Sequence, residues 1–367
     1  MRTLQISLLL TATLLAAGCA NLGYYSQAVT GQLDILARTR AISELLDDNP
    51  AASADTQPVK PSLAPDVKAR LTTVLRVRDF ATQALALPDN NSYRVYASLD
   101  RTQVAWNVVA TPEFSLTPKE WCFPIAGCVP YRAYFSHQRA EEFASELRAE
   151  RLDVRVAGVA AYSTLGWFSD PVFSTQLRRS DADIAALIFH ELAHQELYLP
   201  GDATFNESFA TTVEIEGMRR WLAQDSGTAA LDHYLRDRTR HTQVVDLLLK
   251  FRIRLEALYA LPLPMDPMRA EKARYYEALR NEYTNLRNQW GGYEGYDSWF
   301  TQDINNAHLA AVGLYHQYVP AFQALLASMH GDLPAFYRLA RGLSRLPTAE
   351  RATRLADVNG ADARRVN

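Results

Sequence analysis

The sequence predicts an α+β protein that is predominantly α-helical, and three observations favour this class. Apolar residues recur every three or four positions over much of the chain, which is the period of an amphipathic helix. Runs rich in β-branched and aromatic residues, which favour strands, are short and lie between about residues 100 and 175. After Ser180 the helical period continues almost without interruption. We therefore expect a small sheet followed by a helical C-terminal half.

The overall composition is that of an ordinary globular protein. Of the 367 residues, 48% are hydrophobic and 22% are charged, and the formal net charge is −3. This balance argues against a disordered chain and against a protein with many membrane spans. Basic residues are interspersed with acidic ones rather than grouped, so we expect no nucleic-acid partner.

Residues 1–18 are typical of an export signal. Arg2 precedes an apolar run over 6–17, which is too short to span a bilayer permanently. Residues 16–19, Ala-Ala-Gly-Cys, resemble a bacterial lipobox, in which Cys19 is lipidated after cleavage. The resemblance implies a protein held at the outer membrane by this lipid and facing the periplasm, with residues 19–367 as one mature domain. An ordinary cleaved signal with an incidental cysteine is the alternative.

The helices and strands follow in order along the chain. Apolar spacing predicts a helix over 31–48, a Pro-rich loop over 49–61 and a second long helix that stops near Pro88. The run 103–111 predicts a strand. The alanine-rich segment 137–151 predicts a helix.

The remaining segments complete the predicted order. The alternating stretch 152–162 predicts a strand that borders a cleft. Farther on, helices are expected around Val244–Leu258, over 307–329 and over 333–346. The polar tail after about Arg354 is expected to fray.

Two further cysteines, Cys122 and Cys128, lie six positions apart. Pro124 and Gly127 between them let the chain turn back on itself, and an exported protein meets an oxidising compartment. We therefore expect a local disulfide. A metal-binding role for this pair is the weaker alternative, because no further cysteine or histidine lies next to it in the sequence.

His190 and His194 lie four residues apart in a predicted helix whose start is marked by a capping box, Ser180 with Asp183. Residues four apart lie on one face of a helix, so both imidazoles can bind one metal ion. Glu191 beside them can reach a water on that ion and act as general base. This H-E-x-x-H spacing predicts a single catalytic Zn²⁺. A surface helix with incidental histidines is the alternative.

A catalytic zinc site needs a third protein ligand. Residues 206–210, Asn-Glu-Ser-Phe-Ala, resemble the third-ligand helix of gluzincins, and we predict that Glu207 binds the metal. Glu214, two turns later, is predicted to hold a histidine ring through its second nitrogen. Two alternatives stay open: Glu207 could instead cap a helix together with Thr204, or Glu214 could be the ligand.

These two motifs, together with residues 121–128 and 163–171, resemble a family of predicted bacterial aminopeptidase lipoproteins. The likeness spans nearly the whole mature chain. It implies a zincin-like core, with the small sheet at about 100–175, metal-binding helices at about 181–222 and a helical part at about 225–356. It also implies a zinc peptidase, specifically an aminopeptidase, that acts on peptides.

Further site residues are expected around the metal. The segment before the metal-binding helix could pair through its backbone with an extended peptide, although a structural loop explains it equally well. The substrate-binding residues predicted there are Gly166, Trp167 and Asp170. Tyr315, or its neighbour His316, is predicted to stabilise the oxyanion of the reaction.

Two other functions are consistent with the same residues. One is a non-catalytic, lipid-anchored envelope protein, either binding or chaperone-like, in which zinc is structural. Glu191 argues against it, because a closed structural site has no use for a base beside the metal. The other is a cell-wall amidase. The Gly-x-Met-Glu-Asn signature of the large aminopeptidase family is absent, so the sequence leaves exopeptidase and endopeptidase open.

Overall fold

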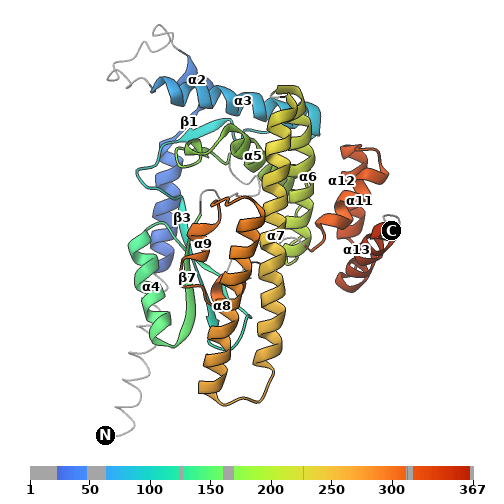
Figure 1. The fold of residues 1–367 in the computed structure, drawn as a ribbon. Helices are drawn as coiled ribbons and strands as arrows, with labels where there is room; N and C mark the ends of the chain where they lie inside the picture. Colours follow the sequence, from blue (N-terminus) through green and yellow to red (C-terminus); the bar gives the residue numbers. More distant parts are fainter. Residues whose placement is uncertain are drawn as a thin grey trace.

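The computed structural model describes residues 23–47, 63–123, 127–159, 169–225, 227–310, 312 and 317–363. Within these residues the chain is an α+β protein dominated by helices, with small sheets, as the sequence predicts. Figure 1 shows the sheet of β3 and β7 on one side of the long helices α7 and α8, with α11 to α13 on the other. Among the described helices, none has both the length and the apolar character that crossing a membrane requires.

The N-terminal part corrects one prediction. Instead of one helix over 31–48, residues 23–38 are helical, β1 spans Thr39–Ala41 and α2 spans Ile42–Leu46. The break arises because β1 pairs with β2 (Val95–Ala97), a distant partner that helical spacing does not reveal. The second predicted helix is confirmed as α3, Pro65–Leu85.

Two three-stranded sheets and one hairpin follow. The first sheet has the order β1-β2-β8, and β8 (Val172–Phe173) runs parallel to β2. The second has the order β6-β3-β7 and is antiparallel, with strands Arg132–Tyr134, Ala105–Pro112 and Leu152–Val159. The hairpin joins β4 (Trp121–Phe123) to β5 (Gly127–Val129), and a disulfide links Cys122 with Cys128 across it.

Helix α4, His137–Ala149, covers one face of the second sheet. Its first turn is capped by Ser136, whose hydroxyl accepts a hydrogen bond from the backbone N–H of Arg139. Alanines 140 and 144 let it lie close to Val108 and Val154 of the strands. The predicted strands and the helix between them are thus present, although residues 160–162 lie outside the described part.

The rest of the chain is helical, as expected from Ser180 onward. The elements are η2 Gln176–Arg178, α5 Asp181–Glu196, α6 Ala203–Asp225, α7 Gly227–Tyr259, α8 Met265–Gln289, α9 Asp297–Phe300, α10 Asn306–Ala310, α11 Val319–Ser328, α12 Leu333–Ser344 and α13 Thr348–Ala363.

Two predictions about this half were wrong. The helix expected over 307–329 is two helices, α10 and α11, and α11 begins with a proline in its first turn, where proline is well tolerated. The tail after Arg354 does not fray at once, because α13 continues to Ala363. Leu355 of α13 is fully buried in the main core, and this burial holds the helix in place.

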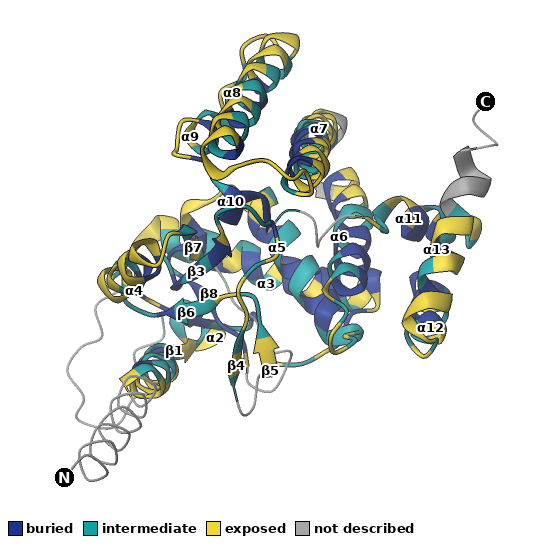
Figure 2. Cartoon of the chain, turned by 90° about the horizontal axis from the view of Figure 1, so that it is seen from below, coloured by how far each residue is buried: buried dark blue, intermediate teal, exposed yellow. Residues whose placement is uncertain are grey.

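The largest hydrophobic cluster surrounds α5 and fixes its position. Helix α5 packs between α3 and α6, and Ile188, Phe189 and Leu192 on it are buried in this cluster. Figure 2 shows α3, α5 and α6 with long buried stretches, whereas α8 is exposed along much of its length. The helix that carries His190 and His194 is therefore a core element, and the surface-helix alternative does not apply.

Candidate metal centre

The start of α5 sets the direction in which its histidines point. Ser180 accepts a hydrogen bond from the N–H of Asp183, and the Asp183 carboxylate accepts one from the N–H of Ser180. The predicted capping box is therefore present. One helical turn separates His190 from His194, and their ring centroids lie 4.9 Å apart. Both imidazoles consequently point toward the same space above the helix.

The connection from α5 to α6 is held by Asn206. Its amide nitrogen donates to the carbonyl of Leu199 (2.8 Å), and its amide oxygen accepts from the N–H of Leu199 (2.7 Å). These two bonds tie the loop to the first turn of α6 and so fix the neighbouring residue, Glu207. The sequence analysis quoted Asn206 within a motif but assigned it no role.

The first turn of α6 also decides one of the open alternatives. The side chain of Asp202 accepts a hydrogen bond from the N–H of Phe205 (3.0 Å), so Asp202 caps this helix instead of Thr204. Asp202 is itself held by Arg351 from α13 at 2.6 Å. Glu207 is therefore not needed to cap the helix, and its carboxylate points toward the two histidines.

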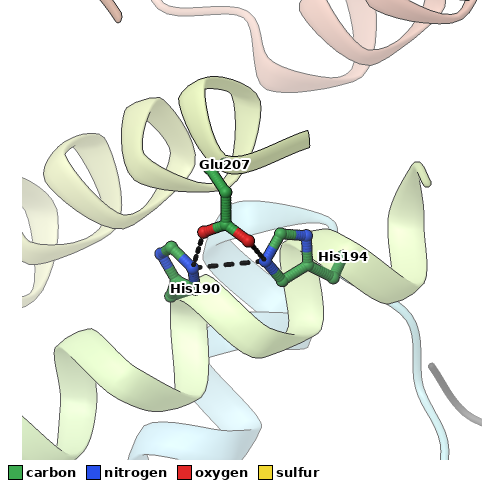
Figure 3. A group of neighbouring side chains, drawn as sticks. All are labelled: His190, His194 and Glu207. Atoms are coloured by element: carbon green, nitrogen blue, oxygen red, sulfur yellow. Dashed lines mark hydrogen bonds and ion pairs between the residues drawn. The ribbon is translucent and has the colours of Figure 1, made fainter. Parts of the chain in front are cut away.

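Three side chains meet at one point between α5 and α6 (Figure 3). The Nε2 atom of His190 lies 3.2 Å from Glu207 Oε2 and 3.2 Å from His194 Nε2, and His194 Nε2 lies 3.5 Å from Glu207 Oε1. A tetrahedral zinc ion with bonds of about 2.0–2.2 Å places its ligand atoms roughly 3.3 Å apart. The spacing of these atoms thus fits one metal ion, and the three residues form a set able to hold it.

The electrostatics of the cluster favour a positive charge at its centre. Burial lowers the pKa of His190, but hydrogen bonds to Glu207 and Glu214 outweigh it and raise that pKa to about 10. Burial raises the pKa of Glu207, and its contacts with His190 and His194 outweigh this and lower it to about 2. The carboxylates therefore stabilise either a proton on His190 or a cation bound by the three side chains.

Glu214 holds the other side of the His190 ring. Its Oε2 lies 3.1 Å from His190 Nδ1, the nitrogen that faces away from the cluster. From α7, the hydroxyl of Tyr234 donates to Glu214 Oε1 (3.4 Å), and Arg238 lies 3.7 Å from the same oxygen. This position leaves Nε2 free to bind a metal and gives Glu214 a supporting place behind the ring.

Glu191 lies beside the cluster on α5 and is partly buried. Its pKa is raised, first by burial and further by the charges of Glu207 and Asp170, against the opposing effect of His190 and His194. A carboxylate with a raised pKa takes up and releases a proton nearer to neutral pH than an ordinary one. This property suits a general base.

The predicted substrate residue Asp170 is buried, with 2% of its surface exposed. Its carboxylate accepts a hydrogen bond from Gln195 Nε2 (3.3 Å), and its backbone N–H donates to Ser92 Oγ (3.3 Å). Its carbonyl accepts from the N–H of Tyr93 (2.7 Å). These contacts attach the segment before β8 to α5, next to the metal-binding histidines. A direct contact of Asp170 with substrate stays a prediction.

Several predicted residues lie outside the described part of the chain, and their roles stay predictions. They are Cys19, Gly166, Trp167, Tyr315 and His316.

Two tyrosines near the cluster were missed by the sequence analysis. Tyr198 follows α5, and its ring meets that of His194 edge to face at a centroid distance of 6.5 Å. Tyr131 lies between β5 and β6, and its pKa is raised by burial and then by Tyr198 and Glu207. Nothing in the local sequence marks Tyr131, because the strands that bring it near α6 are distant along the chain.

Comparison with protein-family models gives a match over most of the chain. A protein-family model whose description reads "Putative aminopeptidase" matches residues 23–355. The comparisons with curated proteins and with solved structures gave no match. The matched range contains His190, Glu191, His194 and Glu207, and it covers most of the chain. The protein therefore belongs to the family that this model describes as "Putative aminopeptidase".

Proposed function

We propose that the protein is a zinc-dependent aminopeptidase with one metal ion bound by His190, His194 and Glu207. The observation that carries this proposal is the convergence of two imidazole nitrogens and one carboxylate at mutual distances of 3.2, 3.2 and 3.5 Å. Two nitrogen ligands and one carboxylate leave the fourth position of a tetrahedral zinc ion for water or substrate. We infer from this donor set a zincin-like, gluzincin-type site.

The openness of the cluster favours catalysis over a structural metal. The side chain of His190 is 19% exposed and that of Glu207 is 28% exposed. A structural zinc site is closed by four protein ligands, whereas a substrate must reach a catalytic one. Together with the match to an aminopeptidase family, this accessibility supports an enzyme over a lipid-anchored binding protein or a cell-wall amidase.

The chain's own residues supply proton transfer and orientation. A zinc ion held by the cluster would polarise the peptide carbonyl and lower the pKa of a bound water to about 7. Glu191 takes the proton of the attacking water and passes it to the leaving amine. Glu214, from behind, keeps the His190 ring in the tautomer that presents Nε2 to the metal.

We further propose that the enzyme acts in the bacterial envelope. The lipobox-like segment that ends at Cys19 supports a lipid anchor at this residue, only a few positions before the first described helix. Ala20, and not an aspartate, follows Cys19. By the resemblance to a lipobox, this residue favours sorting to the outer membrane, with the enzyme facing the periplasm. Its substrates would then be peptides present in that compartment.

The experiment that tests the function uses one peptide library in two forms, with free and with acetylated amino termini. We expect zinc-dependent cleavage of the free-amine peptides alone, loss of cleavage with a chelator and recovery on adding zinc. Glu191→Gln should retain zinc and lose hydrolysis. Cleavage of both peptide forms would defeat the aminopeptidase assignment, and full activity of Glu191→Gln would defeat the mechanism.

A further inference from the structure

The first described helix, residues 23–38, carries a stripe of exposed apolar side chains. Figure 1 draws this helix in blue, leading into β1. The large apolar side chains that stay exposed on it are Tyr25 (39%), Val29 (58%), Leu33 (58%) and Leu36 (40%). They follow one another at intervals of four, four and three residues, so they form a line about 17 Å long on one side of the helix.

The same side of the helix has no charge. Asp34 is the only charged residue between positions 23 and 37, and it lies on the opposite side, where it pairs with Arg38 (2.7 Å) and Arg101 (3.5 Å). A surface helix that meets only water normally turns charged side chains outward and its apolar stripe toward the core. This helix does the reverse. The other exposed residues of the stretch are small or polar and uncharged, namely Gly23, Ser26, Thr30 and Ala37.

The opposite side of the helix is fixed to the rest of the domain. Ile35 is buried in one hydrophobic cluster with Phe173 of β8. The side chain of Gln27 donates to the carbonyl of Ala133 (3.2 Å) and accepts from the N–H of Phe135 (3.1 Å). Because these contacts fix the rotation of the helix about its axis, it cannot turn its apolar stripe inward without breaking them.

The position of Cys19 indicates what covers the stripe. Cys19 lies four residues before Gly23, where the described part of the helix begins. Four residues reach at most about 14 Å in any conformation. A lipid on Cys19 therefore holds the start of this helix next to the surface of the bilayer. Apolar helix faces held there are buried at the boundary between lipid head groups and acyl chains.

The size of the stripe favours lipid over a second protein. Four side chains that are each about half exposed present an area on the order of a few hundred Å², whereas a stable interface between two proteins buries roughly 1,000 Å² or more. A bilayer needs no matched surface, and each apolar group that enters it adds to binding. Since the face carries no charge, its binding does not require acidic lipids.

We infer that the face formed by Tyr25, Val29, Leu33 and Leu36 is a membrane-docking surface that lies on a phospholipid bilayer beside the lipid anchor. The inference rests on the anchor proposed at Cys19 and not on the peptidase chemistry. Because the helix is fixed to the domain, docking of this face holds the whole enzyme in one orientation on the membrane instead of leaving it free on a tether.

The test measures flotation with lipid vesicles of the mature chain, residues 19–367, carrying Cys19→Ser so that no lipid is attached. One set of vesicles is phosphatidylcholine, and the other mixes phosphatidylethanolamine with the acidic phosphatidylglycerol. We expect the chain to float with both, at low and at high salt, because the docking face is uncharged. Val29→Gln together with Leu33→Gln should weaken binding at least about tenfold, since two apolar side chains leave the interface.

The matched control replaces Ile253 and Leu261 together by Gln. These residues are exposed to a similar extent, 67% and 52%, but lie on α7 and just after it. The control should bind vesicles within about twofold of the unmodified chain. Melting temperatures should be unchanged in both double variants, because all four positions are exposed.

Equal flotation of the Val29 and Leu33 variant and the control would overturn the docking surface, as would binding that high salt abolishes. A dimer that the same two substitutions dissociate, followed by light scattering, would assign the stripe to a second copy of the chain and overturn it too. Mass spectrometry of the protein isolated from bacterial envelopes tests the anchor separately. If Cys19 carries lipid and flotation fails, only the docking surface falls, whereas an unmodified Cys19 defeats the proposed anchor itself.

Discussion

Replacing Glu214 with Gln tests how the metal centre is supported. In the structure, Glu214 Oε2 faces His190 Nδ1 at 3.1 Å, while Tyr234 and Arg238 hold its other oxygen from α7. The substitution keeps the shape of the side chain but removes its charge. His190 then loses a charged acceptor, and its ring is oriented less strongly toward the metal.

The expected magnitude follows from this single support. Among the described residues, Nδ1 of His194 is buried and has no hydrogen-bond partner, so His190 is the only one of the two rings fixed by a carboxylate from behind. Loss of such a partner typically weakens metal binding 10- to 100-fold, which corresponds to about 1.4–2.7 kcal/mol. We expect Glu214→Gln to weaken zinc binding within this range.

The assay is a zinc titration in competition with a chromogenic chelator. Glu216→Gln is the matched control, because Glu216 lies on the same helix and pairs with Arg219 and Arg220 rather than with a histidine. The control should bind zinc as the unmodified protein does. Equal zinc affinity in Glu214→Gln and the control would refute the supporting role of Glu214.

Three further predictions concern pH, the α5–α6 connection and the disulfide. The pKa of His190 is raised to about 10, so protonated His190 stabilises the metal-free protein. This stabilisation is complete below about pH 6.5 and is lost as the pH rises toward 10, and calorimetry of the metal-free protein across this range can follow it. Zinc must displace the same proton, so its apparent affinity should rise about tenfold per pH unit from pH 7 to 9 in chelator competition. Asn206→Ala should destabilise the protein by about 2 kcal/mol in urea unfolding and lower its zinc affinity, because the two hydrogen bonds between Asn206 and Leu199, next to Glu207, are lost. Unchanged stability and zinc affinity would contradict this role of Asn206. Replacing Cys122 and Cys128 together by Ser should destabilise the protein by about 2 kcal/mol in urea unfolding, because the disulfide that closes the β4–β5 hairpin is lost; an unchanged unfolding midpoint would contradict this stabilisation.

The parts of the site that could be predicted are those encoded by local spacing. The capping box at Ser180 and the four-residue interval from His190 to His194 depend only on helical geometry, and the structure has both. The position of Glu207 was predictable from a second short motif. Its alternative role as a cap could not be dismissed from sequence, because the competing cap, Asp202, became visible only once the start of α6 was known.

The parts that could not be predicted depend on pairing between distant segments. The break at β1 is caused by β2, and the length of α13 depends on burial of Leu355 in the main core. Tyr131 precedes β6, which pairs with the distant β3, and the charge of Glu207 helps to raise the pKa of Tyr131. Periodicity and motifs carry no information on such contacts, so the sequence analysis did not single out Tyr131 or Tyr198.

The most direct test of the account is zinc-edge anomalous diffraction from crystals of the zinc-loaded protein. One peak is expected, at about 2.0–2.2 Å from the Nε2 atoms of His190 and His194 and from a carboxylate oxygen of Glu207, with a fourth position that faces solvent. A peak elsewhere in the molecule, or a zinc ion closed off by a fourth protein ligand, would contradict a catalytic metal centre at this site.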